Sequence, residues 1–374
     1  MSGPLRVLLV AGEASGDLHG AALVRALRRR VPDIDVAGVG GPRLRAAGMR
    51  VLVDTEHVAT MGLVEVVGTL GRLLRTYRRL LRFLATERPR LVVLIDYPEF
   101  NLRLARRAKR RGVPVFYFVA PQVWAWRRGR VRAIVERVDK LGVVFPFEPD
   151  LYNDRRHLAE FIGHPLLDVV RPTRPPAETR ARYGLDPERP VLALLPGSRK
   201  KEVRYLLPPM RSAAARLASE GWQPIVALAE SLAPVDLEEA VGGALGIPVA
   251  HGDTYDVVAA ADAAIVASGT ATLETALLGC PMVIVYRMAS LTFWIARCLV
   301  DVNWIGMPNI ILQRSVFPEL VQSAATPEAM AAAVRDVRAR RAEVGAALAQ
   351  LRTRLGTPGA AERAADLALA LVQR

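Results

Sequence analysis

The sequence predicts an α/β protein with two doubly wound domains, each a parallel sheet flanked by helices, facing a central cleft. Short runs rich in Val, Leu and Ile alternate with Arg/Ala/Leu helical patterns along all 374 residues, which is typical of βαβ units. Two sharp strand-to-helix junctions, Gly12–Asp17 and Pro196–Arg199, occupy matching places in the two halves. A chain of this length also exceeds the roughly 100 to 200 residues of a single core.

In the first half, apolar runs of three to five residues predict the strands. They span 7–11, 36–39, 51–53, 91–95, 115–119 and 141–144. Helical patterns lie between them. Parallel strands need such crossover helices, so the alternation favours a single parallel sheet.

The segment Arg171–Pro176 contains three prolines. Proline removes a backbone donor and fixes φ, so we expect a linker here. Behind it the strands resume, at 191–195, 224–228, 263–267 and 282–286, with an Ala-rich helical tail from about Thr326. We therefore predict domains at residues 1–170 and 171–345. A helical tail follows at 346–374, for which packing back on the first domain is one option.

The positive charge is concentrated in the front half. Residues 1–170 hold 29 Lys and Arg against 17 Asp and Glu, whereas the whole chain has a net charge of +14. We expect this half to meet an anionic partner. Nucleic acid is disfavoured because aromatic residues make up only 6% of the chain and no stacking platform is interleaved with the charges.

Other features place the protein in a reduced, cytoplasmic setting. The two cysteines, Cys280 and Cys298, show no metal-ligand spacing and are too few for a disulfide framework. The apolar run after Arg6 is too short for a signal-peptide core, and no stretch reaches the roughly 18 apolar residues of a membrane span.

The two junctions leave backbone N–H groups pointing into open space, where an anion can bind. The first contains Glu13, Ser15 and Gly16, and the second contains Ser198 and the fixed positive charge of Arg199. A phosphate or diphosphate is the natural ligand of the second junction. Glycine and serine also serve ordinary turns, and Arg199 with its lysine neighbours fits a solvated basic run equally well.

Asp96 follows the predicted strand 91–95 and is a candidate general base. Its alternative role is the N-cap of the next helix. Glu13 is a second carboxylate at the same sheet edge, whereas Asp17 fits a helix-capping role. A lone histidine is more often structural than catalytic, which applies to His19 and His164.

A third junction places Ser268, Gly269 and Thr270 after the strand 263–267, with Glu274 further along the helix. Backbone amides for a phosphate and Glu274 for ribose hydroxyls would make a nucleotide site; Glu274 could equally be a helix-dipole partner. The Asp33-Ile34-Asp35 sequence precedes its strand, so we predict a turn there, no metal site and no cofactor.

The stretch Met61–Leu84 has a helical apolar stripe, with Arg72, Arg75, Arg78, Arg79 and Arg82 off it. This pattern fits a membrane-surface helix and a core-packing helix alike. Trp124 and Trp126 could line an acyl pocket or simply pack.

Together these motifs resemble the bacterial lipid-A-disaccharide synthase family, inverting glycosyltransferases of the GT-B fold. The matching segments run in constant order across most of the chain: 11–17, 61–66, 95–96, 100–101, 121–126, 161–164, 194–199, 267–271, 286–288 and 308–309. Two departures are visible. Ala14 stands where many members have threonine, and Glu99 where aspartate is common.

The resemblance implies that UDP-2,3-diacylglucosamine and 2,3-diacylglucosamine 1-phosphate (lipid X) form a β1→6 disaccharide and UDP. It implies an acceptor and membrane-facing first domain and a UDP-sugar-binding second domain. Asp96 matches the family's proposed general base and Arg199 the arginine that contacts the diphosphate. The resemblance also implies nucleotide-binding residues: Asn309 lies in the family's Pro-Asn segment near the donor, and Ser15, Gly16, Ser268, Gly269, Thr270 and Glu274 fall in matching glycine-turn and nucleotide-binding segments.

The resemblance further implies peripheral association with the inner face of the inner membrane through Met61–Leu84, and it leaves a homodimer open. The nearest alternative is another GT-B enzyme acting on a UDP-amino sugar, either an N-acetylglucosaminyltransferase or a 2-epimerase. A basic protein that only docks on a membrane or nucleic acid is the non-enzymatic alternative.

Overall fold

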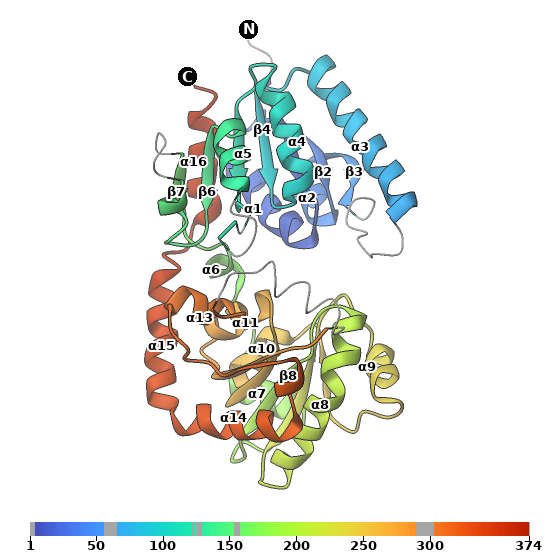
Figure 1. Cartoon of the computed structure of the whole chain (residues 1–374), viewed down its shortest axis with the longest axis vertical. Coiled ribbons are helices and arrows are strands. Elements are labelled where there is room, and N and C mark those ends of the chain that lie inside the picture. The colour runs from blue at the N-terminus through green and yellow to red at the C-terminus, as the bar shows by residue number, and fades with distance from the viewer. Residues whose placement is uncertain are drawn as a thin grey trace. The chain divides into compact units, whose positions relative to one another are not determined.

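The computed structural model describes residues 4–55, 66–121, 123–124, 129–152, 158–288 and 303–373. The chain forms two compact units (Figure 1), Met1–Asp168 with Leu355–Arg374 and Val169–Arg354. The first boundary lies two residues before the linker that the prolines indicate. Residues 346–354, which we assigned to the tail, belong to the second unit.

The first unit is built on a seven-stranded parallel sheet in the order β3-β2-β1-β4-β5-β6-β7. Its strands are β1 (Arg6–Ala11), β2 (Asp35–Gly40), β3 (Arg50–Asp54), β4 (Leu91–Ile95), β5 (Val115–Phe118), β6 (Lys140–Val143) and β7 (Ala159–Phe161). All five residues of β4 are buried, as expected of a strand covered on both faces.

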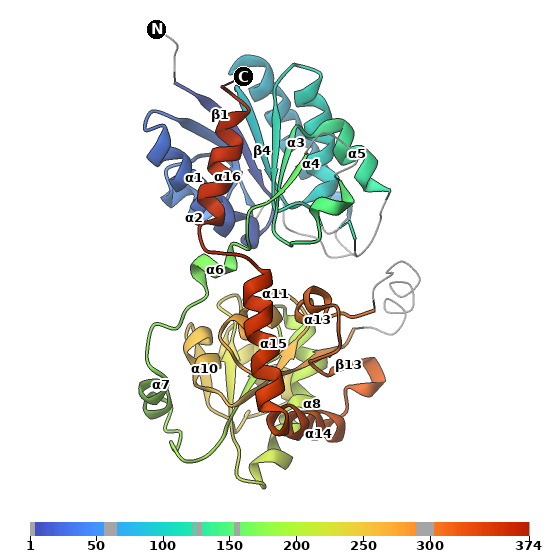
Figure 2. The same ribbon diagram turned by 90° about the vertical axis from the view of Figure 1, so that its left-hand side faces the viewer.

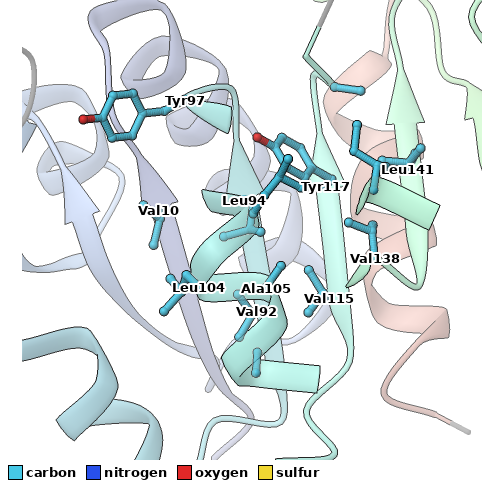
Figure 3. Close-up of a cluster of buried hydrophobic side chains, with 14 of the residues drawn as sticks. Val10, Val92, Leu94, Tyr97, Leu104, Ala105, Val115, Tyr117, Val138 and Leu141 are labelled. Carbon is cyan, nitrogen blue, oxygen red and sulfur yellow. The ribbon is translucent and has the colours of Figure 1, made fainter. Parts of the chain in front are cut away.

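Helices cover both faces of this sheet (Figures 1 and 2). They are α1 (Ala14–Arg30), α2 (Pro42–Ala46), α3 (Val66–Thr86), α4 (Pro98–Lys109), α5 (Arg130–Arg137) and α16 (Ala360–Ala370), with α6 (Leu166–Val169) at the unit boundary and a 3₁₀ turn at Pro149–Leu151. One core packs α3, α4 and α5 against the sheet (Figure 3). The other packs α1 and α16.

The second unit repeats the plan with six parallel strands in the order β10-β9-β8-β11-β12-β13. The strands are β8 (Val191–Leu195), β9 (Gln223–Leu228), β10 (Val249–His251), β11 (Ala263–Ala267), β12 (Met282–Tyr286) and β13 (Glu319–Val321). The helices are α7 (Pro176–Arg182), α8 (Lys200–Ala218), α9 (Pro234–Val241), α10 (Thr254–Ala260), α11 (Thr270–Leu277), α13 (Met307–Leu312), α14 (Pro327–Ala339) and α15 (Arg341–Arg354), with a 3₁₀ turn at Gln322–Ala324.

Every strand that the sequence predicts is present. The three that it missed, β7, β10 and β13, are three residues long and lie at sheet edges. They carry Glu160, His251 and Glu319, and edge strands are less apolar because one side lacks a neighbouring strand. Short, partly polar strands leave no periodic signal.

The last helix, α16, belongs to the first unit, where it packs beside α1 (Figure 2). Ala364, Ala365 and Ala368 on its inner face are fully buried. On its outer side Arg30 makes ion pairs with Glu362 and with Asp366. Part of the predicted tail therefore does pack on the first domain, starting at Leu355.

Strand order reverses once in each sheet, between β1 and β4 and between β8 and β11. In each of these pairs, the crossover helices leave the two strands toward opposite faces of the sheet. The space above the carboxyl ends of the pair is therefore not covered by a crossover. Doubly wound proteins bind ligands there. The residues that follow β1, β4, β8 and β11 are therefore those to inspect for function.

Candidate functional site

The turn after β1 is shaped by its contact with the turn after β4. A Cβ atom added at Gly12 would lie 2.6 Å from Cγ of Tyr97, so only glycine fits. Glu13 follows as the N-cap residue of α1, with an extended backbone and an exposed side chain. Burial raises the pKa of Tyr97, and the negative charge of Glu13 raises it further. Glu13 and the residues after β4 thus share one sheet edge, as the sequence predicts.

Asp96 lies in this turn with a left-handed backbone, φ +46°, and Tyr97 follows at φ +49°. The α4 helix begins at Pro98 with Tyr97 as its N-cap residue, so Asp96 is not the N-cap. Burial raises the pKa of the half-buried Asp96 carboxyl, and a hydrogen bond from the Tyr97 N–H opposes that shift. A higher pKa makes the carboxylate a stronger base.

The other residues of the first junction have different roles. Ser15 is exposed, whereas Gly16 is buried, and a Cβ there would lie 3.3 Å from Cβ of Ala11. Gly16 thus serves close packing of α1 on β1. The buried carboxylate of Asp17 accepts hydrogen bonds from the N–H groups of Gly41, Arg43 and Leu44 at 2.7 to 3.1 Å. Asp17 therefore caps α2 and is structural.

Both histidines that the sequence singles out are neutral at pH 7. Burial lowers the pKa of His19 to about 4. Burial, with a smaller contribution from His19, lowers that of His164 to about 3. Nδ1 of His164 accepts the Leu166 N–H at 3.2 Å, which gives it a structural role.

Glu148, which sequence reasoning missed, organises the loops after β5 and β6. Its carboxylate is 1% exposed and accepts the N–H groups of Val144 and Phe145 at 3.1 and 2.9 Å. Its other oxygen accepts the indole N–H of Trp124 at 3.3 Å. Burial raises its pKa to about 7. Trp124 also packs edge-on against Phe147; Trp126 lies outside the described residues.

Arg199 and Ser198 lie after β8, at the start of α8. Gly197 has φ +115°, a conformation that favours glycine. The Ser198 N–H donates to one carboxylate oxygen of Glu202 at 3.1 Å, and the Arg199 guanidinium donates to the other at 2.7 Å. Glu202, unnoticed in the sequence, thus gives this junction an anionic partner. The Arg199 side chain remains 76% exposed.

The junction after β11 presents Gly269 and Thr270 at the surface. The Ser268 hydroxyl donates to the Ile305 carbonyl at 2.9 Å. Glu274 is half-buried and accepts the Tyr255 hydroxyl at 2.9 Å. Burial raises the pKa of Glu274, which the tyrosine hydroxyl partly offsets. Tyr255 therefore fixes the carboxylate that we assign to ribose, a link that the sequence does not reveal.

Asn309 is fully buried and its amide is saturated by protein groups. Nδ2 donates to the Phe317 carbonyl and to the Glu319 carboxylate, both at 2.8 Å. Oδ1 accepts the Val316 and Phe317 N–H groups, both at 3.0 Å. An amide makes about four such bonds, so none is left for a ligand. The resemblance implies nucleotide binding for Asn309, but its amide is bonded to protein groups instead.

Glu319 links Asn309 to the nucleotide loop. Its carboxylate also accepts the Ile305 and Gly306 N–H groups at 2.8 and 3.0 Å. The Ile305 carbonyl in turn holds the Ser268 hydroxyl. The Asn309 amide is thus linked to the loop after β11 through this chain of contacts.

The apolar stripe of α3 mostly packs into the first unit. Leu80 and Leu84 are buried, and Leu73, Tyr77 and Leu81 pack against the same core. Leu74 is 46% exposed, and Arg75, Arg78, Arg79 and Arg82 are exposed. Residues 61–65 and the side chains of 66–70 lie outside the description. No helix among the described residues is long and apolar enough to cross a membrane.

Metal-binding side chains do not gather in the described ranges. No group of three or more His, Cys, Asp or Glu residues there could hold a metal ion. Cys298 and residues 289–302 lie outside these ranges. That the reaction needs no metal stays a prediction.

Comparison with known proteins confirms the resemblance seen in the sequence. A family model described as lipid-A-disaccharide synthetase matches residues 7–368. Lipid-A-disaccharide synthase from Syntrophus aciditrophicus strain SB is 47% identical over 376 residues, covering 98% of this chain and 98% of that protein.

Solved structures show the same fold. The calicheamicin glycosyltransferase CalG4 matches with a TM-score of 0.65 at 18% identity, covering 99% of both chains. A UDP-GlcNAc 2-epimerase from Neisseria meningitidis matches with a TM-score of 0.65 at 10% identity, covering 99% of this chain and 100% of that one. The GT-B prediction is confirmed. At such low identity the epimerase likeness concerns the fold alone and gives no support to epimerase activity.

The saturated amide of Asn309 predicts a stability effect. Asn309→Ala leaves several buried groups without partners, so we expect the free energy of unfolding to fall by about 3 kcal/mol. Urea denaturation measures it, with the exposed amide variant Gln350→Ala as control. Unchanged stability together with weakened UDP binding would instead identify Asn309 as a ligand contact.

Proposed function

Because the chain belongs to the lipid-A-disaccharide synthetase family, we propose that it transfers 2,3-diacylglucosamine from UDP-2,3-diacylglucosamine to the 6-hydroxyl of lipid X. The products are the β1→6 disaccharide 1-phosphate and UDP. The chain is a GT-B glycosyltransferase. The observation that supports the proposal is that Asp96, a carboxyl group with a raised pKa, and Arg199 each lie beside the reversal of strand order in their own sheet. We assign the base to Asp96 and the diphosphate contact to Arg199.

In this proposal the first unit supplies the base. Asp96 takes the proton of the acceptor 6-hydroxyl while that oxygen attacks the anomeric carbon of the donor. The bond from that carbon to the diphosphate oxygen breaks, and UDP leaves with the electron pair. A single displacement of this kind inverts the anomeric centre. Glu13, at the same sheet edge, is the second carboxylate that we assign to catalysis.

The second unit binds the nucleotide. Arg199 and the N–H groups around Ser198 stabilise the charge that develops on the diphosphate, and Glu202 yields these contacts to the incoming anion. Gly269 and Thr270 offer backbone and hydroxyl groups to a phosphate. Glu274, fixed by Tyr255, accepts hydrogen bonds from the ribose hydroxyls. In the first unit, the glycine turn that contains Ser15 and Gly16 is a further segment that we assign to nucleotide binding.

We further propose peripheral association with the inner face of the inner membrane. The exposed arginines of α3 and the exposed Leu74 support this, since each basic side chain near an anionic bilayer contributes about 1 kcal/mol. The protein should bind anionic vesicles in low salt and be released as the salt concentration rises, because salt screens exposed charges. Absence of binding to anionic vesicles in low salt would contradict the proposal. A homodimer remains compatible with the proposal.

The direct test is an assay with purified protein, UDP-2,3-diacylglucosamine and lipid X. Mass spectrometry should find the disaccharide 1-phosphate together with UDP. Epimerised UDP-sugar in place of a disaccharide would support the 2-epimerase alternative.

Replacing Asp96 tests the base. Asp96→Asn should lower kcat by roughly 10²- to 10⁴-fold with little change in donor binding, because the amide cannot accept the proton. It should also abolish the fall in rate as pH decreases through the raised pKa of Asp96. The exposed turn variant Asp33→Asn is the control. A near-normal rate in Asp96→Asn excludes the assignment.

Replacing Arg199 tests the diphosphate contact. Arg199→Ala should lower kcat by on the order of 10²-fold or more, because transition-state charge loses its cation. Arg199→Lys should recover part of the loss. Lys201→Ala, which removes an exposed cation of the same helix, should change the rate little. Equal losses in the two alanine variants would mean that only the general positive field matters.

We propose that no metal ion takes part. The rate should be unchanged in excess EDTA, measured with the same assay. Complete loss of activity that added Mg²⁺ restores is the contrary result.

A further inference from the structure

The turn that carries Asp96 has an unfavourable backbone. Asp96 and Tyr97 are consecutive residues with φ near +50°, a region that side-chain-bearing residues rarely occupy. Such conformations persist only where the surroundings impose them, and they concentrate at functional sites. The contacts that impose the left-handed conformation on Asp96 and Tyr97 therefore also determine the direction of the Asp96 carboxylate.

Two donors fix the Asp96 carbonyl oxygen. The Tyr117 hydroxyl on β5 donates to it, and Nδ2 of Asn101 on α4 donates to it at 2.7 Å. The same nitrogen donates to the Ile95 carbonyl at 3.2 Å. The peptide group after Asp96 is thus held from the neighbouring strand and from the following helix.

The side chain of Tyr97 also restrains the turn. Its ring is 6% exposed, leaves no space for a Cβ at Gly12 and packs 5.7 Å from the Phe100 ring, centroid to centroid. Figure 3 shows Tyr97 and Tyr117 at the same end of the buried cluster, beyond Val92 and Val115. Rotation of the 96–97 peptide would have to break these contacts together.

Neither donor is accessible to a substrate. Tyr117 and Asn101 are both 0% exposed, and Oδ1 of Asn101 is buried without a hydrogen-bond partner among the described residues. An Asn101 amide turned the other way would place that oxygen against two carbonyl oxygens, so these two acceptors fix its orientation. Any effect of these residues on the reaction must pass through Asp96.

We propose that Tyr117 and Asn101 are positioning residues, which hold the strained Asp96 turn so that its carboxylate is aimed at the acceptor hydroxyl. This rests on the proposed role of Asp96 as general base. A base displaced by about 1 Å can lose on the order of 10² in rate, so fastening the backbone on both sides has a direct catalytic consequence.

The test is a double-mutant cycle on kcat. Tyr117→Phe removes the hydroxyl and keeps the ring; it should lower kcat by about 10- to 100-fold, with KM for both substrates changed less than about twofold. In the Asp96→Asn background the same change should lower kcat by less than about twofold, because no base is left to misplace. Tyr152→Phe is the matched control, since that buried hydroxyl has no partner in the described structure.

The outcomes separate the two proposals. A near-normal rate for Asp96→Asn alone would overturn the base and with it the positioning role. A slow Asp96→Asn combined with a harmless Tyr117→Phe, or with equal losses in both backgrounds, would overturn only the positioning role. If Tyr117→Phe fails to fold, Asn101→Leu, which removes the other donor, passes through the same cycle with the same criteria.

Discussion

The reversal of strand order in each sheet is the constraint on which the site depends. Parallel strands end at one edge of a sheet, and only where two crossovers diverge does that edge remain uncovered. Asp96 and Gly12 border this place in the first sheet, and Arg199 and Ser268 border it in the second. The same topology occurring twice explains why small residues follow strands in matching positions of the two halves.

The sequence was sufficient for every described strand longer than three residues and for the residues directly after those strands. A strand such as β4, buried along its whole length, reads as an unbroken apolar run, and the residue that follows it must lie at the carboxyl edge. Partners between separate elements could not be read in this way. Tyr117 is 21 residues from Asp96, and nothing in a tyrosine inside an apolar strand indicates which carbonyl its hydroxyl will meet.

Asn309 is a second case in which the sequence could not show the partners of a side chain. Its place in a family motif suggested a ligand contact, but its atoms are used up by Phe317, Val316 and Glu319. A motif identifies a segment as important without saying whether a side chain touches the ligand or builds the loop that does. Burial and hydrogen bonding decide between these, and both are properties of the fold.

Peptide N–H groups stabilise several carboxylates of this strongly basic chain. The buried Asp17 and Glu148 and the half-buried Glu319 each accept at least two backbone N–H groups, whereas the buried Asp236 and Asp256 also pair with cationic side chains. Most arginines of α3 lie at the surface. Peptide donors have fixed directions, so they place a carboxylate more exactingly than a long cationic side chain can. The exposed arginines of α3 are part of the basic excess that produces long-range attraction to anions.

The position of α16 has a consequence for biosynthesis. Part of one face of the first sheet, which includes Phe116 and Phe118, is covered by α16, which follows the whole second unit in the sequence; α1 packs on the same face. The ribosome completes the whole second unit before it releases the segment that finishes the first. A nascent chain therefore carries an unfinished apolar surface throughout translation of its latter half, and a message truncated after codon 354 yields a product with that surface permanently bare.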